Sequence, residues 1–500
     1  MSAPTSHYGA AEVRYVTAFQ AEASPARLHY ALALSDTHWA PADRERLTVL
    51  DIGCGLGVTA RLLAAANPGW DVYGIDLQPA HIAEAREAAA AAGVDNVHFL
   101  EVDLTEHDEA GFERLLPEVD IVVCWGVWTW VPDAAREGVV RLLKSRVKPG
   151  GVVLMAYNAL PGYSDTLVMQ RLLEEACRNT TGSLEERGMA AFAAIEMLKS
   201  AGALHLPQEQ MLARMIDSAK RAPGYMVHEW LTSFWRPVYH ADIATALQAA
   251  RLDYAGSANP SRSLPTLQLN AEQRAAIEQA PPGIHRETLF DLFLQRRFRT
   301  DLYVRGRRSG GGRALAEIPL VLAVAPELMD TSIATAAGEA VLKAEHQAIL
   351  AGALADGPRM LGELAALPGL GDLTMMEIAV MLIESGSAHP LWRPITRDPV
   401  TVERALRSNV QLLTSVAQEG AAGGSVLGAV APALGSAIAA SPSDLAVLIE
   451  LQKGVPPMPA EIAQRLIPGD APPEMLTNAT GSIEQLLAMR LGAWRGLGLL

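Results

Sequence analysis

A turn with three glycines constrains this chain more than any other feature. Gly53, Gly55 and Gly57 follow the short apolar segment of residues 47–50 and precede the helical pattern of residues 58–67. A strand-to-helix turn that lacks Cβ atoms lets a ligand approach the backbone closely. The spacing is G-x-G-x-G, whereas dinucleotide-binding turns have G-x-G-x-x-G. The turn therefore predicts an α/β domain with a ligand site at this strand end.

The residue before the turn indicates the charge of that ligand. Asp51 lies two positions before the first glycine, and its carboxylate would repel a pyrophosphate and attract an ammonium group. S-adenosylmethionine carries an ammonium group and no phosphate. We therefore expect Asp51, the three glycines and the intervening Cys54 to contact this cofactor. A nicotinamide-dependent oxidoreductase and an aminopropyl transferase are the alternatives on the same fold.

Two further carboxylates lie at predicted strand ends. Asp76 ends the strand pattern of residues 71–75, 19 positions after the last glycine of the turn, where an acidic residue can accept hydrogen bonds from both ribose hydroxyls. Asp103 follows the next strand, where it or its neighbouring amide can bind the adenine amino group. The adjacent residues Leu77 and Leu104 are expected to line the same nucleoside site.

The first third of the chain alternates between strand and helix patterns. Apolar strand segments are expected at residues 47–50, 71–75, 97–101, 121–124 and 152–156. Continuous apolar strands that alternate with helices predict a parallel sheet covered on both faces. After about residue 158 helical patterns dominate, and the Arg-, Gly- and Ser-rich residues 305–313 indicate a linker before a small α+β unit.

Composition excludes several classes of protein. The formal net charge of −15 argues against a nucleic-acid partner, because such proteins usually carry a basic face. The cysteines Cys54, Cys124 and Cys177 have neither zinc-ligand spacing nor the number that a disulfide framework needs, so we expect no metal and a reducing cytoplasm. Residues 1–15 lack the apolar stretch of a secretory signal. The uncharged residues 420–443 are rich in Ala, Gly and Ser and hold two prolines, which disfavours a membrane span.

Three tryptophans follow the predicted fourth strand. Trp125, Trp128 and Trp130 lie where an open α/β sheet binds its ligands. Indole faces attract cations, so these residues predict an aromatic wall beside a sulfonium or an amine, with Trp125 as the strongest candidate. The alternative for Trp128 and Trp130 is packing of a helix onto the sheet.

Candidate catalytic residues are less sharply defined. Tyr157 and Asn158 follow the fifth predicted strand, so they are expected at the ligand edge, where they could hold a methyl acceptor; Asn158 could instead bond its own turn. His228 is a candidate general base, with a buried packing role as the alternative. Tyr15 is a candidate to cap the cofactor from the N-terminal arm or to serve in packing. With Trp125, these residues form the candidate catalytic set.

The sequence resembles a known family. The segments that carry the likeness, besides the glycine turn and its aspartates, are residues 155–163, 227–231, 234–239, 291–299 and 431–436. They are similar to bacterial class I methyltransferases that bear a methyltransferase regulatory domain, a family that includes rickettsial protein lysine methyltransferases. The similarity is densest before residue 310 and spans most of the chain.

The resemblance implies an α/β fold class with four domains. A Rossmann-like, seven-stranded methyltransferase domain would occupy residues 1–165, and a mostly helical regulatory or dimerisation region would occupy residues 166–310. A winged-helix-like domain at residues 311–395 and a helical region at residues 396–500 would follow. The helices of the middle region could form a homodimer.

The sequence departs from the family at several positions near the expected site. Trp125 replaces a usual His, and Trp128 replaces a usual Tyr. Val58 and Thr59 stand where the family has Gly-Asn after the turn, and Tyr163 stands for a usual Trp. The replaced His removes a proton acceptor, so the family's acceptor chemistry does not transfer directly.

We therefore predict an S-adenosylmethionine-dependent methyltransferase that methylates an amine, with protein lysine as one candidate. An O- or N-methyltransferase of a small metabolite or surface sugar is the first alternative. A non-catalytic module that binds S-adenosylmethionine is the second, although the intact carboxylates Asp51, Asp76 and Asp103 favour catalysis. The expected partner is a methyl acceptor, protein or small molecule, and the expected location is the cytoplasm.

Overall fold

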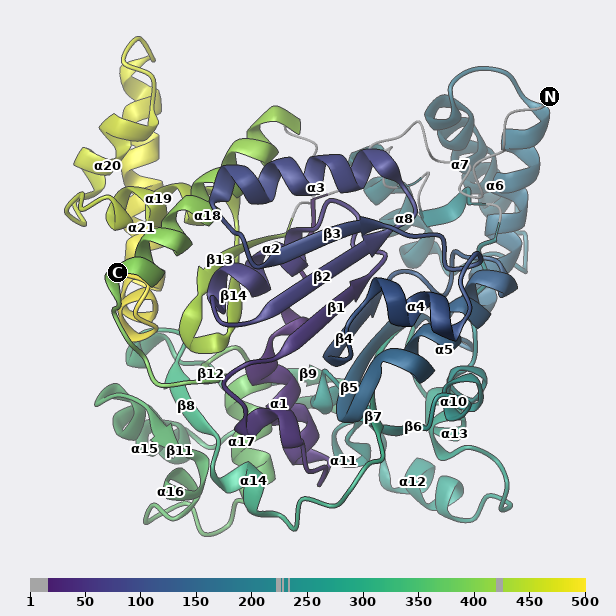
Figure 1. Cartoon of the computed structure of the whole chain (residues 1–500), viewed down its shortest axis with the longest axis horizontal. Helices are drawn as coiled ribbons and strands as arrows, with labels where there is room; N and C mark the ends of the chain where they lie inside the picture. The colour runs from purple at the N-terminus through teal and green to yellow at the C-terminus, as the bar shows by residue number, and fades with distance from the viewer. Residues whose placement is uncertain (1–16, 222–225, 227–228, 233, 420–425) are drawn as a thin grey trace.

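The computed structural model describes residues 17–221, 226, 229–232, 234–419 and 426–500 (Figure 1). Its centre is a seven-stranded sheet with the order β3-β2-β1-β4-β5-β7-β6. The strands are β1 (Thr48–Ile52), β2 (Asp71–Asp76), β3 (Val97–Glu101), β4 (Val119–Trp125), β5 (Val147–Asn158), β6 (Leu252–Ser257) and β7 (Phe298–Arg305). The first five strands are parallel, and β7 pairs antiparallel with both β5 and β6. The fold class and the five strands expected from the sequence are confirmed.

Helices cover both faces of the sheet, as the continuous apolar strands predicted. The helices of the first face are α1 (Pro25–Leu34), α2 (Val58–Ala66) and α3 (Pro79–Ala92), and those of the second are α4 (Glu109–Leu115), α5 (Asp133–Arg146) and α10 (His240–Gln248). The Ala-rich α3 ends at Gly93, whose φ of 65° is the left-handed conformation that closes a helix. Helix α4 begins at Asp108, whose side chain accepts a hydrogen bond from Gly111 N.

A helical lobe follows β5. Helices α6 (Leu167–Asn179), α7 (Leu184–Ser200) and α8 (Glu209–Arg221) enclose their own apolar core at the upper right of Figure 1. The chain then returns through α10, β6, α11 (Pro265–Gln268), α12 (Ala271–Glu278) and α13 (Arg286–Asp291) to β7. The last two strands of the sheet thus come from the region expected to be regulatory, beyond residue 165.

The segment after the sheet is a small α+β unit, as expected. Its elements are α14 (Arg313–Ala316), β8 (Pro319–Leu322), β9 (Ser332–Thr335), β10 (Gly338–Val341), α15 (Ala344–Ala355), β11 (Arg359–Met360), α16 (Leu361–Ala365), α17 (Met375–Glu384) and β12 (Ala388–Pro390). Strand β8 lies between β11 and β12, and β9 pairs with β10. The winged-helix assignment of this unit stays a prediction.

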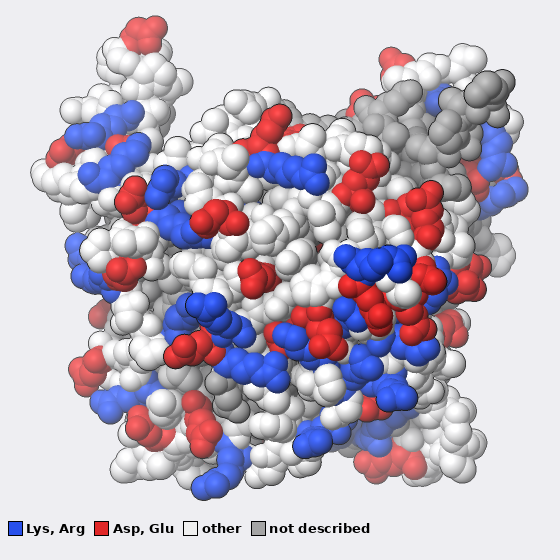
Figure 2. Space-filling view, in the orientation of Figure 1, with Lys and Arg blue, Asp and Glu red and all other residues white. Residues whose placement is uncertain are grey.

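The last hundred residues contain a β-hairpin that the sequence did not predict. They form α18 (Pro399–Glu419), β13 (Leu427–Ala431), β14 (Ser436–Ala440), α19 (Pro442–Gln452), α20 (Pro459–Leu466) and α21 (Pro473–Gly496). The hairpin and α18 pack on α2, so every residue of α2 is buried. Among the described helices, none combines the length and apolar composition that crossing a bilayer requires. On the face shown in Figure 2, basic and acidic side chains of the described residues are interspersed.

A buried cluster of charges joins β7 to the helices beside it. The Arg299 guanidinium bonds Asp301 at 2.9 Å and Asp291 at 2.6 Å. His240 Nδ1 lies 2.9 Å from Asp301, and the Tyr157 hydroxyl donates to the same carboxylate at 2.6 Å. Burial alone would raise the pKa of Asp301, but Arg299 and His240 hold it well below its usual value. The cluster therefore fixes the antiparallel strands against β5.

Removing the guanidinium from this cluster should destabilise the fold. Arg299→Met leaves buried carboxylates without their partner, so we expect the free energy of unfolding to fall by about 3–5 kcal/mol. Urea unfolding measures this change. The control is Arg171→Met on α6, whose arginine pairs with Glu175 in solvent and should contribute about 0–1 kcal/mol. Equal stability of the two variants would contradict a structural role for the cluster.

Candidate functional site

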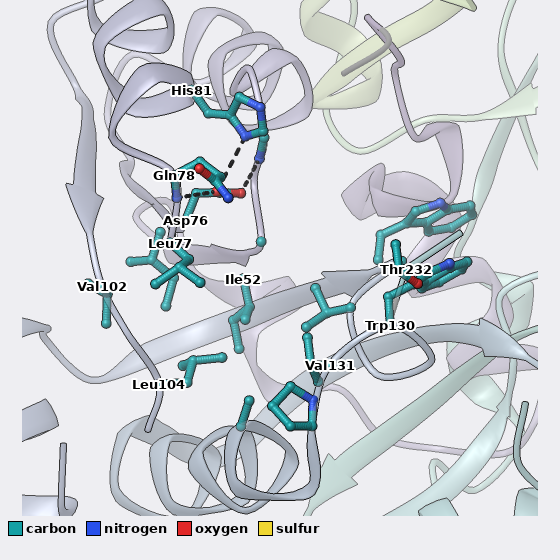
Figure 3. A pocket seen from close by; sticks show the side chains of 18 of the residues that line it. Ile52, Asp76, Leu77, Gln78, His81, Val102, Leu104, Trp130, Val131 and Thr232 are labelled. Carbon is teal, nitrogen blue, oxygen red and sulfur yellow. Dashed lines mark hydrogen bonds and ion pairs between the residues drawn. The ribbon is translucent and has the colours of Figure 1, made fainter. Parts of the chain in front are cut away.

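A cavity of about 550 Å³ opens at the carboxyl ends of the parallel strands. It is the edge at which open α/β sheets bind ligands. The predicted site residues among its lining are Gly53, Gly55, Asp76, Leu77, Asp103, Leu104, Trp125 and Asn158. Figure 3 shows Asp76 with Gln78 and His81 on one side and Trp130 with Thr232 on the other. The structure thus brings most of the predicted residues together.

The geometry of the turn requires its glycines. Gly53, Gly55 and Gly57 all have positive φ, at 68°, 52° and 68°. A Cβ on Gly53 would lie 2.4 Å from Val127 Cγ2, and a Cβ on Gly57 would lie 2.5 Å from the Phe99 ring. Gly53 and Gly55 face the cavity, whereas Gly57 packs below it. Side chains at these positions would therefore disturb both the turn and its ligand surface.

Asp76 is held in place for an interaction with hydroxyl groups. Its Oδ2 accepts a hydrogen bond from Gly55 N at 2.9 Å, and its Oδ1 accepts one from Gln78 N at 2.9 Å. His81 Nδ1 lies 3.4 Å from Oδ1 (Figure 3). An ionised carboxylate can accept about four hydrogen bonds, so Oδ2, which accepts the bond from Gly55, keeps capacity for a ligand hydroxyl. The arrangement suits the ribose contact predicted from the sequence.

Asp51 lies at the bottom of a small recess beside the main cavity. The recess and the cavity share Ala18, Gln20, Gly53 and Trp125. Burial raises the pKa of Asp51 to about 8, and the charge of Asp76 adds to this effect. A positively charged ligand group would oppose both causes and restore the carboxylate. Cys54 also lines the recess, so the residues expected at an ammonium site lie together.

The nucleoside end of the cavity has apolar walls and one acidic residue. Leu77 and Leu104 lie on either side of it, as Figure 3 shows. Asp103 accepts hydrogen bonds from the amide and hydroxyl of Thr105 at 2.8 and 2.7 Å, which fixes the loop after β3. A flat aromatic base fits between such walls, with polar groups at its rim.

Of the three tryptophans, two line the cavity and one packs a helix onto the sheet. Trp125 and Trp130 line the cavity, and the ring centroids of Trp125 and Phe298 are 5.5 Å apart. Trp128 is buried among residues of α5 and β4, so it has the packing role instead. The aromatic wall is therefore formed by Trp125, Trp130 and Phe298, the last of which the sequence did not single out.

The opposite end of the cavity is polar and comes from distant segments. Asn158 Nδ2 donates to Glu229 Oε1 at 3.1 Å, and the Tyr163 hydroxyl donates to the same oxygen at 3.3 Å. Asn158 and Glu229 are both buried, and Thr232 completes this end. Glu229 was not among the predicted residues. The adjacent residue His228 was predicted instead, and adjacent residues of a helix point in different directions. The sequence around position 228 was therefore the signal that could have pointed to Glu229.

One predicted residue, Tyr157, points away from the cavity, and two further predicted residues lie outside the part of the chain that the structure describes. Tyr157 is fully buried on the other face of β5, where it bonds Asp301, because successive strand residues point to opposite faces. Its expected role as an acceptor-binding residue is therefore corrected, whereas the next residue, Asn158, faces the cavity. Tyr15 and His228 lie outside the described residues. Within the described part of the chain, no group of three His, Cys, Asp or Glu side chains could hold a metal ion.

Two sequence families match the chain. Residues 50–153 match the family described as "Methyltransferase domain", and residues 222–305 match the "Predicted methyltransferase regulatory domain". The first match covers the glycine turn and the strands that follow it. The second covers Glu229 and the antiparallel strands β6 and β7. Both ends of the cavity are thus within, or next to, matched segments.

Individual relatives agree with these matches. An uncharacterized protein of Synechocystis is 28% identical over 387 residues, which are 76% of each chain. A ubiquinone biosynthesis O-methyltransferase of Acinetobacter baumannii is 34% identical over 110 residues, which are 22% of this chain and 42% of the relative. PKMT2 from Rickettsia typhi in complex with AdoHcy has a TM-score of 0.69 at 17% identity, covering 97% of this chain and 99% of that one. The PKMT2 similarity extends through all the domains and shows the fold.

The glycine turn, the matched families and the shared fold lead to one assignment. Residues of both matched segments line the cavity, which lies at the carboxyl ends of the parallel strands. The chain is an S-adenosylmethionine-dependent methyltransferase with a Rossmann-like catalytic domain and a methyltransferase regulatory domain.

Proposed function

We propose that the cavity binds S-adenosylmethionine at one end and an amine acceptor at the other. The nucleoside lies against Asp76 and Asp103, and the methionine end reaches into the recess of Asp51. The acceptor nitrogen lies between the aromatic wall and Glu229. The observation that supports an amine is a buried carboxylate, hydrogen-bonded by Asn158 and Tyr163 at the end of the cavity beyond the tryptophans.

The chemistry of the acceptor end favours an amine over a hydroxyl. A carboxylate and aromatic faces both attract an ammonium ion. The amine must lose a proton before it attacks, because its ordinary pKa is about 10.4. Glu229 is the carboxylate at this end that can accept the proton as the nitrogen turns toward the methyl group. The nitrogen–carbon bond then forms as the carbon–sulfur bond breaks, leaving S-adenosylhomocysteine.

Protein lysine is the amine that we propose. The support comes from the likeness in fold to PKMT2 of Rickettsia typhi over nearly the whole chain and from the sequence resemblance to rickettsial protein lysine methyltransferases. The similarity to a ubiquinone biosynthesis O-methyltransferase covers only 22% of this chain. It therefore bears on cofactor binding and gives no support to a quinone acceptor.

The exposed apolar face of the α6–α7 lobe supports a homodimer. Leu167 and Val168 on α6 are 41% and 44% exposed, Met197 on α7 is 66% exposed, and Leu204 in the following loop is 87% exposed. Exposed apolar side chains gathered on one lobe commonly mark an interface. We propose that a second copy of the chain covers this face.

The Asp51 carboxyl should lose a proton when the cofactor binds. A pKa of about 8 keeps this group protonated in the empty site at pH 7, whereas the cofactor ammonium stabilises its ionised form. We expect about one proton released per cofactor bound at pH 7. Calorimetry at pH 7 in buffers with different ionisation enthalpies measures this proton. Asp51→Asn should release none and should bind about 10- to 100-fold more weakly.

The proposed contact between Asp76 and the ribose tests the placement of the cofactor independently of Asp51. Asp76→Ala removes the acceptor for the ribose hydroxyls, so we expect loss of cofactor binding by calorimetry, while Asp71→Ala at the exposed start of β2 serves as the control. Unchanged affinity in Asp76→Ala would place the cofactor elsewhere.

The raised pKa of Asp51 also means that the empty protein loses stability as pH rises from about 4 to about 8. Asp51→Asn should lack that loss.

Glu229→Gln should impair methyl transfer more than cofactor binding. The amide keeps the shape of the side chain but accepts protons far less readily, so we expect kcat to fall by about 100-fold or more. S-adenosylhomocysteine affinity should stay unchanged, and exposed Glu272→Gln on α12 is the control. Transfer of labelled methyl groups to cell fractions measures activity. Label confined to small molecules would eliminate the protein lysine acceptor.

The homodimer is tested by molar mass in solution. Light scattering coupled to size exclusion should give twice the chain mass of 53.3 kDa. Met197→Glu with Leu204→Glu should yield monomers, because charges oppose burial of this apolar face. The matched control is Met475→Glu, exposed on α21 outside the lobe. A monomeric parent protein would overturn the proposal.

A further inference from the structure

The segment of residues 17–20, here called the strap, crosses the methionine end of the cavity. Ala18 and Gln20 line both the cavity and the recess that holds Asp51. Phe19 lies between them and faces the opposite way, with only 3% of its surface exposed. The strap therefore has one face toward the cofactor site and one face toward the protein core.

The backbone of the strap is anchored at two points. Gln20 N donates a hydrogen bond to Thr59 Oγ1 at 3.1 Å, at the beginning of α2. Phe19 N donates to the carbonyl oxygen of Val426 at 2.9 Å. Val426 directly precedes β13, so one anchor belongs to the glycine-turn helix and the other to the C-terminal hairpin. Thr59 is one of the positions at which the sequence departs from the family that it resembles.

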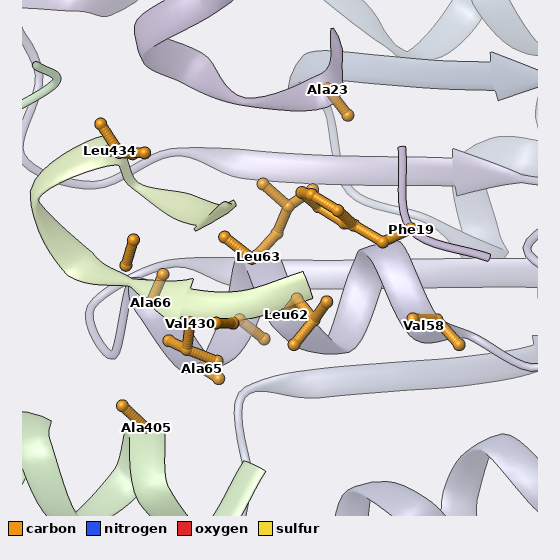
Figure 4. Packing of buried hydrophobic residues seen from close by; sticks show 14 of the residues in the cluster. Phe19, Ala23, Val58, Leu62, Leu63, Ala65, Ala66, Ala405, Val430 and Leu434 are labelled. Atoms are coloured by element: carbon orange, nitrogen blue, oxygen red, sulfur yellow. The ribbon is translucent and has the colours of Figure 1, made fainter. Parts of the chain in front are cut away.

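The side chain of Phe19 fits against a glycine of the hairpin. Figure 4 shows Phe19 beside Leu62 and Leu63 of α2, with β13 running close to the same helix. A Cβ on Gly428 would lie 2.9 Å from Phe19 Cγ and 2.8 Å from Leu62 Cδ1. Any side chain at this position would have to push the Phe19 ring or the helix away. The strap can therefore hold its position only because residue 428 of β13 is a glycine.

The tip of the hairpin is fixed to the same two elements. Ser24, at the end of the segment that continues the strap, donates from Oγ to the Leu434 carbonyl at 3.1 Å. Asn67, just after α2, donates from Nδ2 to the Gly435 carbonyl at 2.7 Å. The hairpin therefore contacts α2 and holds the chain at Phe19 in the strap and again at Ser24 beyond it.

We propose that the β13–β14 hairpin is a positioning element of the cofactor site. It holds the strap over the methionine end of the cofactor, so that cofactor affinity depends on packing at the far end of the chain. This inference rests on the proposed placement of the cofactor. Neither Phe19 nor Gly428 lines the cavity, so any effect of these two residues on affinity must act through the strap.

The proposal is tested with Gly428→Val, which crowds the Phe19 ring, and Phe19→Ala, which removes it. We expect the Kd for S-adenosylhomocysteine to rise about tenfold in each variant, because binding must then order a strap that the parent protein already holds in place. Hydrogen exchange of a peptide covering residues 17–24 should accelerate, and the peptide covering β1 should not. Gly428→Ala provides a milder variant if the valine variant does not fold.

The matched control is Leu487→Ala on α21. This residue belongs to the same buried cluster, so its truncation lowers stability without contact with the strap, and its Kd should equal that of the parent protein. Wild-type affinity in folded Gly428 and Phe19 variants would overturn the proposal. Equal weakening in Leu487→Ala would also overturn it, because the effect would then follow stability alone. Failure of Asp76→Ala to weaken binding would instead reject the placement of the cofactor.

Discussion

The structure around the cavity depends on two carboxylates held beside a backbone turn that contains three glycines. Asp51 is buried, and its charge is opposed both by burial and by Asp76, so its pKa rises to about 8. Asp76 is fixed by the amides of Gly55 and Gln78. A ligand that brings a cation to one carboxylate and hydroxyls to the other relieves the electrostatic cost of this arrangement. The same turn admits such a ligand because its positive-φ glycines leave the backbone open.

Every other part of the site is positioned by packing onto this centre. The charged cluster of Arg299, Asp301 and His240 fixes β7 beside β5. That pairing brings Phe298 next to Trp125, while Glu229 is held by Asn158 and Tyr163. On the first face of the sheet, the C-terminal hairpin covers α2 and reaches the strap. Glu229, Thr232 and Phe298, from the segment that matches the regulatory domain, thus complete the cavity lining.

The sequence predicted the parts of the site that depend on local pattern. Five apolar strands, the glycine turn and the strand-end residue Asp76 follow from spacing alone, because parallel strands present their carboxyl ends at one edge. It missed β7 because Arg299 and Asp301 interrupt the apolar pattern expected of a buried strand. Tyr157 was misplaced because strand boundaries do not reveal which of two adjacent residues faces the ligand. Glu229 and Phe298 lie in segments that carry the family resemblance, but no local pattern singled out either side chain.

What the sequence determined by itself is the class of cofactor and the chemistry at its end of the cavity. Those properties arise from residues within about 55 positions of each other, at intervals that one strand–helix unit fixes in space. The tertiary structure decided which side chains line the polar end of the cavity and which residues pack behind the strap. Glu229 and Asn158 are 71 residues apart in the sequence, and Gly428 meets Phe19 only after the chain returns to α2. Contacts between segments so far apart depend on long-range packing, which leaves no periodic pattern in the sequence.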